Sequence, residues 1–297
     1  MRRVFVLGNA TLDLVQRVAA LPSPGETVLS GGVERCAGGK GLNQAVAAAR
    51  AGAQTVLIAP VGQDQDGKYL GDAVVREERL EARWLASPCP TDLSSIWVAR
   101  DGRNMIVSSA SCASWLTSIE ALLALADLEA GDTIVMQGNL SRSTTRDALE
   151  FARARCATSI LNTAPIAWDM AGLLAGVDIV VANEIEAEQL ARQSPGILDP
   201  TCPERALVVT RGEHGAALTQ GGRTVIVPAP EVDVVDTSGA GDVTVGTIAA
   251  FLGKGRALEQ ALAVAIAAAS LSVTRGGTTP SFPSACEIAD LAARLVD

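Results

Sequence analysis

Short apolar runs rich in β-branched residues alternate along this chain with longer segments of helical period. The runs lie at 3–7, 55–59, 133–137, 177–182 and 206–210. The helical segments lie at 41–51, 67–79, 143–155, 184–193, 243–253 and 257–273. Continuous apolar strands that alternate with helices are typical of a mainly parallel sheet whose two faces are both covered. The alternation therefore predicts an α/β fold and directs the search for a site to the loops after the strands.

Two segments, 12–37 and 93–109, interrupt this alternation. Both have the character of hairpin strands, and the second is expected to turn at Asp101-Gly102. Because both are inserted between core elements, they predict a small β-structured lid over the open sheet. No linker is long enough to separate two domains, so residues 1–297 are expected to form one domain.

Charge and hydropathy exclude several classes of protein. The chain carries 24 Lys and Arg against 33 Asp and Glu, a formal charge of −9, which argues against a nucleic-acid partner. No apolar stretch reaches the ~18 residues that a membrane span needs, and the N-terminal run is interpreted as a strand. The six cysteines form no C-x-x-C pair, which indicates reduced thiols and a cytoplasmic protein.

The segment "VDTSGAGDVTVGTIAAFL" at 235–252 places Asp236 and Asp242 on either side of Ser238-Gly239-Ala240-Gly241. Small residues at a helix start leave the first amide N–H groups free, and these groups bind anions with the help of the helix dipole. A carboxylate beside them can take a proton from a substrate hydroxyl while the amides stabilise a phosphoryl group. The alternative is a capped helix after a glycine turn.

A second glycine-rich loop, "CAGGKGLNQAVAAARAG", occupies 36–52. Its glycines allow the backbone to approach a ligand closely, and Lys40 and Asn43 supply donors from the first helical turn. The loop matches neither G-x-x-x-x-G-K-[ST] nor G-x-G-x-x-G, so neither standard nucleotide loop applies. A glycine turn with a solvated lysine remains the alternative.

Two further strand-to-helix loops carry polar residues. In "VANEIEAEQL", Asn183 is expected to cap the helix, and an acid of the first turn, Glu184 or Glu186, could also hold a hydrated Mg²⁺. "VVTRGEHGAAL" contains His214, the only histidine, for which a surface position is favoured over a catalytic role.

In order and spacing, these loops resemble the signatures of the ribokinase, or PfkB, family of carbohydrate kinases, and within it those of ribokinases. The resemblance covers nearly the whole chain and rests on "GGKGLNQAVAAARAGA", "ANEIEAE", "DTSGAGD" and "SVTRGGTTPSFP". It implies a three-layer α/β/α sandwich with a mainly parallel central sheet and a small β-sheet lid. It also implies ATP-dependent transfer of the γ-phosphoryl group to a hydroxymethyl group of a sugar, with Mg²⁺ and K⁺ as ions.

The resemblance further implies roles for individual residues. Asp242 would be the catalytic base, and the amides of Gly239, Ala240 and Gly241 would form the anion hole. The sugar would be bound by Asp13, Gly39, Lys40 and Asn43, with Thr11 and Asn139 at two more sugar positions. ATP would be bound by Asn183, Thr210, Gly212 and Gly215, with Glu186 organising Mg²⁺ through water. The K⁺ site would comprise the side chains of Asp236 and Ser281 and the backbone oxygens of Ser238, Ser272, Arg275 and Gly277.

Two departures leave the sugar open, because Thr11 and Asn139 stand where ribokinases have Asn and Glu. A nucleoside kinase of the same family is the nearest alternative, although the chain is only 3% aromatic and Trp97 is the lone aromatic of the lid segments. A relative that binds sugar or nucleotide without catalysis is another. A dinucleotide-dependent dehydrogenase is disfavoured, since "LGNATLD" after the first strand lacks its glycine pattern. The lid edge is a candidate homodimer interface.

Overall fold

The computed structural model describes residues 2–100, 103–170, 172–193 and 205–296. Its central sheet has nine strands in the order β13-β12-β11-β10-β9-β8-β1-β4-β5. The strands are β1 (Arg3–Leu7), β4 (Gln54–Gly62), β5 (Leu80–Ser87), β8 (Thr133–Gln137), β9 (Thr158–Asn162), β10 (Ile179–Asn183), β11 (Ala206–Thr210), β12 (Ala216–Gln220) and β13 (Arg223–Val227). All neighbours from β5 to β11 pair in parallel, whereas β12 and β13 are antiparallel. The mainly parallel α/β sheet is therefore confirmed.

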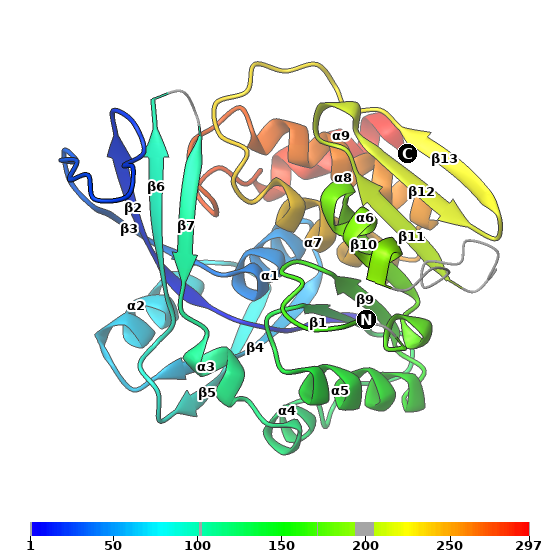
Figure 1. Cartoon of the computed structure of the whole chain (residues 1–297). Helices are drawn as coiled ribbons and strands as arrows, with labels where there is room; N and C mark the ends of the chain where they lie inside the picture. The colour runs from blue at the N-terminus through cyan, green and yellow to red at the C-terminus, as the bar shows by residue number, and fades with distance from the viewer. Residues whose placement is uncertain (1, 101–102, 171, 194–204, 297) are drawn as a thin grey trace.

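Helices cover both faces of this sheet (Figure 1). One face carries α1 (Lys40–Arg50), α2 (Gln65–Val74), α7 (Ala240–Gly253), α8 (Leu258–Ser272) and α9 (Ala285–Leu295). The other carries α3 (Ser111–Trp115), α4 (Ser118–Ala124), α5 (Arg142–Ala154) and α6 (Glu184–Gln193). Along β1, Val4 and Val6 belong to the first core, and Phe5 and Leu7 to the second. Successive strand side chains point to opposite faces, so one buried strand serves both cores.

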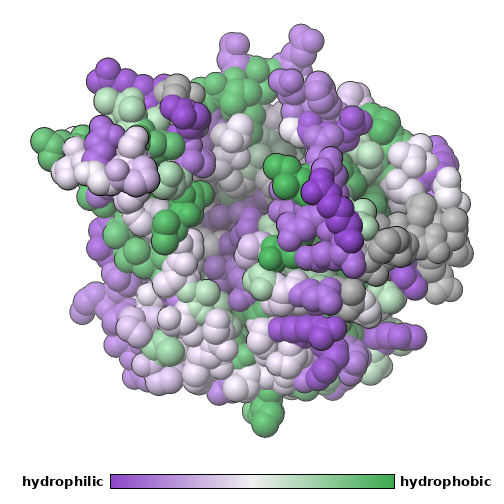
Figure 2. Space-filling model, viewed as in Figure 1, coloured by the Kyte–Doolittle hydropathy of each residue, from purple (hydrophilic) through white to green (hydrophobic). Residues whose placement is uncertain are grey.

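The lid is a separate four-stranded sheet with the order β3-β2-β6-β7. It contains β2 (Thr11–Val18), β3 (Glu34–Gly38), β6 (Leu93–Ala99) and β7 (Asn104–Ser108). β2 and β6 pair in parallel, whereas the outer pairs are antiparallel. The predicted lid is confirmed, while the expected turn at Asp101-Gly102 lies outside the described residues. Figure 2 shows the surface hollowed between the lid and the main body, with hydrophilic residues in the hollow.

The sequence predicts some element boundaries incorrectly. The helix expected over 67–79 ends at Val74, and the chain turns before β5 begins at Leu80. β5 was not predicted, because Glu81 and Arg83 interrupt its apolar residues; it lies at the sheet edge. The short strands β9, β12 and β13 and the helices α3, α4 and α9 were also not predicted.

Two expectations from composition can be compared with the described residues. Within the described ranges, no helix combines the length and apolarity that crossing a bilayer requires. Five cysteines, at positions 36, 89, 112, 156 and 286, carry free thiols, and Cys202 lies outside the described residues.

Candidate active site

Asp242 lies at the start of α7, where that helix meets the start of α1. Its side chain is buried, with 5% of the residue exposed. Asn43 Nδ2 donates to Asp242 Oδ2, and Gln44 Nε2 donates to Asp242 Oδ1, both at 2.9 Å. An ionised carboxylate has about four lone-pair positions, so these two bonds fix its orientation and leave acceptor capacity on both oxygens. The two helices can approach closely here because Gly246 has no side chain. A Cβ at this position would lie only 2.4 Å from the Gln44 carbonyl oxygen.

A second glutamine extends this contact to the sheet. Gln137, the last residue of β8, donates from Nε2 to Gln44 Oε1 at 2.7 Å. Both glutamines are fully buried. Neither was singled out from the sequence, because a glutamine in an apolar helix or strand gives no local signal of its partner. Their partners are 93 and 198 residues away in the chain.

The backbone at the start of α7 presents amide groups beside Asp242. Gly239 has φ +79°, and a Cβ there would lie 2.6 Å from the Phe282 ring, so this position needs glycine. The Ala240 N–H points to Thr237 O at 3.4 Å. The amides of Gly239, Gly241 and Asp242 donate to no protein acceptor in the described part of the chain. Free amides at a helix N-terminus form an anion site.

The lid contributes a second buried carboxylate, Asp13, which is 4% exposed. Burial raises the pKa of Asp13 to about 6; Asp242 adds a smaller increase, and the Thr11 and Ser94 hydroxyls oppose it. A directed series of hydroxyls ends on this carboxylate: Ser108 to Ser94 (2.9 Å), Ser94 to Thr11 (3.3 Å) and Thr11 to Asp13 Oδ1 (2.7 Å). Thr11 therefore donates its hydroxyl proton to Asp13.

The other residues expected at a sugar site gather around the start of α1 and the end of β8. Gly39 has φ +91°, and a Cβ there would lie 2.8 Å from the Thr11 backbone nitrogen. Lys40 is the first residue of α1 and is half-buried. Among the described residues, the side-chain oxygens of Asn43 and Asn139 are buried and have no hydrogen-bond partner. Such oxygens are acceptors for hydroxyl donors of a ligand.

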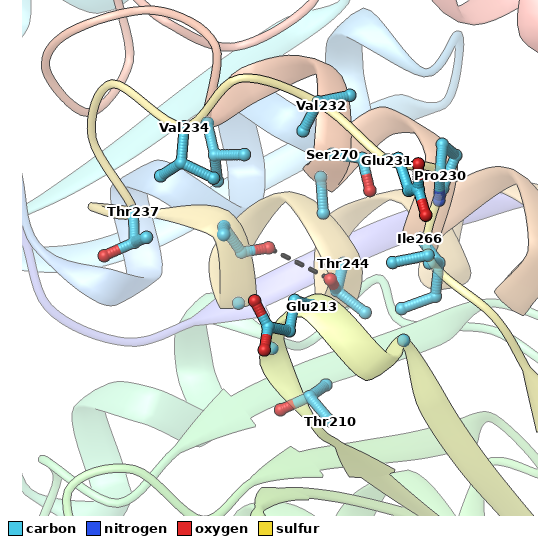
Figure 3. A pocket seen from close by; sticks show the side chains of 17 residues that line it. Thr210, Glu213, Pro230, Glu231, Val232, Val234, Thr237, Thr244, Ile266 and Ser270 are labelled. Carbon is cyan, nitrogen blue, oxygen red and sulfur yellow. Dashed lines mark hydrogen bonds between the residues drawn. The ribbon is translucent and has the colours of Figure 1, made fainter.

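A cavity of about 340 Å³ opens on the other side of the α7 N-terminus (Figure 3). It is lined by Thr210, Gly212, Glu213, Gly215, Ala229, Pro230, Glu231, Val232, Val234, Thr237, Ala240, Gly241, Thr244, Ile266, Ala269, Ser270 and Val273. Three residues expected at the nucleotide, Thr210, Gly212 and Gly215, are therefore brought together beside the amide loop. In Figure 3, Val232 and Val234 lie across the cavity from Thr210 and Glu213. Val232 and Val234 form an apolar wall of this cavity, which was not predicted from the sequence. The volume falls within the usual ~300–1,000 Å³ of ligand pockets.

Asn183 and Glu186 form a reciprocal cap at the start of α6. Asn183 Oδ1 accepts from the Glu186 N–H (2.8 Å), and the Glu186 carboxylate accepts from Asn183 N (3.1 Å) and Nδ2 (2.9 Å). Thr163 Oγ1 also donates to Glu186 at 2.9 Å. The expected N-cap is therefore present. Asn183 does not line the cavity, although it pairs in register with Thr210, which does. Because Glu186 accepts three hydrogen bonds, its remaining capacity suits contact with a metal-bound water better than direct coordination.

Asp236 bridges the two loops that hold the expected cation residues. Its carboxylate accepts from the amides of Ser238 and Gly277, both at 2.9 Å. These bonds lower the pKa of Asp236, against the opposing effect of burial. Ser281 is fully buried and bonded to Thr278 O at 2.8 Å, while Ser272 O accepts from the Arg275 N–H at 3.1 Å. Among the described residues, no cluster of three acidic, histidine or cysteine side chains is placed to hold a metal. These loops supply a carboxylate, a hydroxyl and backbone carbonyls, which are the oxygen donors that suit a hard cation.

A buried carboxylate beside free helix amides, with a ligand-sized cavity adjoining them, defines a site of the phosphotransferase type. Residues 1–285 match the model of the pfkB family carbohydrate kinases. The chain therefore belongs to the pfkB family of carbohydrate kinases, enzymes that phosphorylate a sugar hydroxyl.

Individual relatives agree with this assignment over almost their full length. The chain is 31% identical to a ribokinase of Bacillus subtilis (98% of this chain, 99% of the relative) and 30% identical to a deoxyribokinase of Salmonella typhi (95% of each). Its structure is similar to that of an Arabidopsis thaliana ribokinase complexed with ribose and ATP, with TM-score 0.82, 25% identity, and 98% and 99% of the two chains covered. The fold and the enzyme class predicted from the sequence are thereby confirmed.

Proposed function

We propose that this protein transfers the γ-phosphoryl group of ATP to the hydroxymethyl group of ribose or a closely related sugar. The observation that carries the proposal is the position of Asp242. It stands between buried polar side chains on the lid side and a ligand-sized cavity of about 340 Å³, and free amides adjoin it. A group at this boundary can contact both reactants.

In this mechanism, a sugar hydroxyl binds within hydrogen-bond reach of Asp242 and transfers its proton to the carboxylate. The oxygen then attacks the γ-phosphorus as the bond to the ADP leaving group breaks. The amides of Gly239, Gly241 and Asp242 stabilise the negative charge on the transferred group. Because these donors are fixed by the helix start, they need little reorganisation during the reaction.

The sugar side has the chemistry of a polyol pocket. The oxygens of Asn43 and Asn139 can accept hydrogen bonds from sugar hydroxyls, and Asp13 can accept through the oxygen that Thr11 does not occupy. Thr11 and Asn139 change the set of hydroxyls that can be paired, and a pocket of hydrogen bonds discriminates strongly against mispaired ligands. The relatives include both a ribokinase and a deoxyribokinase, so the sugars to compare first are ribose and 2-deoxyribose.

ATP would occupy the cavity of Figure 3, with its base against Val232 and Val234 and its phosphates toward Gly241, which also lines the cavity. The complex of a relative with ribose and ATP supports this assignment. Glu186 would hold Mg²⁺ through water, and Mg²⁺ would neutralise phosphate charge when bound. With a net charge of −9, the protein provides little long-range attraction for MgATP, so affinity comes from local amides and the ion.

A monovalent cation, K⁺ in the first instance, fits the loops that Asp236 joins. The groups that would hold it are the side chains of Asp236 and Ser281 and the backbone oxygens of Ser238, Ser272, Arg275 and Gly277. Its role would be to stabilise the loop that precedes Gly239. K⁺ is therefore expected to raise the unfolding temperature of the ligand-free protein more than Na⁺ does. D236N, which keeps the shape of the side chain, is expected to abolish this difference.

A homodimer through the lid is part of the proposal. β7 is an edge strand, and its residues Met105, Ile106 and Val107 are all exposed. Exposed apolar edge strands tend to be covered in assemblies. Sedimentation of the wild-type protein and of I106K would report whether this edge joins two copies.

ADP release across a panel of pentoses, deoxypentoses, hexoses, polyols and nucleosides, with and without K⁺, tests the proposed activity. We expect one pentose or deoxypentose to give the highest kcat/KM, with weaker activity on nucleosides. A nucleoside as the best substrate would favour the alternative of a nucleoside kinase. Ligand binding without ADP release from any member of the panel would indicate a non-catalytic relative.

A further inference from the structure

Two amide side chains form a continuous hydrogen-bonded chain from the central sheet to Asp242. Gln137 lies at the end of β8, Gln44 lies in the first turns of α1, and Asp242 opens α7. The two hydrogen bonds measure 2.7 and 2.9 Å, and both glutamines are fully buried. The chain thus connects three elements at the point where the reaction is placed.

This series of hydrogen bonds has a direction, because an amide donates only from its nitrogen and accepts only at its oxygen. Gln137 Nε2 donates to Gln44 Oε1, which leaves Gln44 Nε2 facing Asp242 Oδ1. If the Gln44 amide were turned over, its oxygen would face the Asp242 carboxylate and its NH₂ group would face the NH₂ of Gln137. Both contacts would then be unfavourable, so the Asp242 carboxylate on one side and the Gln137 NH₂ group on the other both favour the orientation in which Gln44 donates to Asp242.

The position of Gln137 costs free energy of folding, because one of its polar atoms is buried without a partner among the described residues. Its Oε1 is buried and, among the described residues, has no hydrogen-bond partner. A Cβ on Gly8 would lie 2.0 Å from that oxygen, so the glycine makes room for the amide. A buried acceptor without a donor is uncommon in native proteins and calls for an explanation. The explanation that we infer is that Gln137 is retained because its NH₂ group orients the Gln44 amide.

We propose that Gln137 and Gln44 are positioning residues that hold the Asp242 carboxylate in one orientation, ready to accept the proton of the sugar hydroxyl. The proposal rests on the assignment of Asp242 as the base. Asn43 holds the second carboxylate oxygen from the same helix turn, so rotation of the carboxylate is prevented at both oxygens. Neither glutamine needs to touch substrate for this role.

The variants Q44M and Q137M remove the amides with little change of shape. Loss of a hydrogen bond to a charged group predicts a roughly 10- to 100-fold lower kcat for Q44M. The KM values for sugar and ATP should stay within about twofold. Q137M is expected to lower kcat less, about three- to tenfold, since Gln44 can still adopt the correct orientation part of the time. The double variant should match Q44M alone, because Gln137 acts only through Gln44.

T247V is the matched control for packing. Thr247 lies on α7 and is fully buried, and its hydroxyl has no partner among the described residues. Its replacement by the isosteric valine should leave kcat near the wild-type value. A merely structural role for the glutamines would lower the unfolding temperature of Q44M and Q137M additively and leave kcat unchanged.

The pH dependence of kcat in Q44E is a measurement that a purely structural role of Gln44 would not change. A glutamic acid can donate to Asp242 only while it is protonated, so the ratio of Q44E to wild-type kcat should fall as pH rises. Asp13 also interacts with Asp242, and burial raises the pKa of Asp13 to about 6. Because Asp13 is present in both proteins, its titration largely cancels in the ratio.

Two results separate this proposal from the proposed function. If D242N loses turnover while Q44M and Q137M keep kcat within twofold of wild type, the positioning role is wrong and the base assignment stands. If D242N keeps near-normal turnover, the base assignment itself is wrong. If Q44M does not fold, Q137M and the Q44E pH ratio decide: a normal kcat and a flat ratio overturn the proposal.

Discussion

The two sides of the α7 N-terminus bind by different means. The sugar side consists of polar side chains, among them the buried Asp13 and Asn43 and the half-buried Asn139; the oxygens of the two asparagines have no donor among the described residues. The nucleotide side consists of backbone amides and an apolar wall that includes Val232 and Val234. Side-chain hydrogen bonds distinguish one arrangement of hydroxyls from another, whereas amides and apolar contacts accept any ligand of suitable shape and charge. Substrate choice is therefore expected to depend on the sugar side, and phosphate binding on the backbone.

Asp242 lies between the two sides, and its substitution should have the largest effect. D242N is expected to lower kcat by about 10²- to 10⁴-fold, because the amide cannot accept the hydroxyl proton. The fold should persist, since Asn43 can turn its unpartnered Oδ1 toward the new NH₂ group. Steady-state kinetics and calorimetric binding of sugar and nucleotide check this. Near-normal kcat, or loss of both binding affinities, would contradict it.

On the nucleotide side, G239A tests the role of the backbone. A methyl group would meet the Phe282 ring at 2.6 Å and the left-handed φ of +79° is strained for alanine, so the amides would shift. We expect kcat to fall by about 10²- to 10³-fold with a smaller change in the sugar KM. G253A is the control, since a Cβ at Gly253 in the same helix meets nothing within 4 Å. Equal activity of the two variants would refute a requirement for the Gly239 backbone.

On the sugar side, D13N should weaken binding and stabilise the empty protein. The sugar KM is expected to rise about 10- to 100-fold, because the neutral amide is a weaker acceptor than the carboxylate. Folding raises the pKa of Asp13 from 3.8 to about 6, so ionising it in the folded protein costs free energy. Ionised Asp13 therefore lowers the free energy of unfolding. This loss is absent below pH 3.8, increases between pH 3.8 and about pH 6, and stays at about 3 kcal/mol at higher pH.

The pH dependence separates this effect from a general gain in stability. D13N should therefore unfold at a higher temperature than wild type at pH 7.5, with the difference vanishing near pH 4. Differential scanning calorimetry at the two pH values measures this. A stability difference that is the same at both would show that Asp13 titration is not its source.

The smallest effect is expected at the apolar wall. V232A removes two methyl groups from a side chain that is 39% exposed, so the KM for ATP should rise only about two- to fivefold. The sugar KM should not change. V75A, at an 85% exposed valine outside the cavity, is the control. A change in sugar preference in V232A would break the distinction between the two sides.

The sequence predicts the features that are local in the chain. Glycines at 38, 39 and 239 precede a helix in a visible pattern, and the Asn183–Glu186 cap has a fixed spacing of three residues. The alternation of strands and helices likewise identifies the sheet. In each of these cases, the residues that interact are neighbours along the chain.

The unpredicted part of the site depends on contacts between distant residues. Gln44 and Gln137 lie within apolar segments and become informative only when α1, α7 and β8 come together. Ser94 reaches Thr11 because β2 and β6 pair in parallel across the lid, a pairing that no turn in the sequence specifies. The apolar wall around Val232 also comes from separate segments.

The position of the phosphate on the product tests the central claim most directly. Phosphorus and carbon NMR of the product formed from ATP and the best pentose identify the oxygen that has been phosphorylated. We predict one equivalent of ADP for each sugar phosphorylated at its terminal hydroxymethyl group, with no product from D242N. ADP formed without sugar phosphate, or phosphate on the anomeric hydroxyl, would contradict the account.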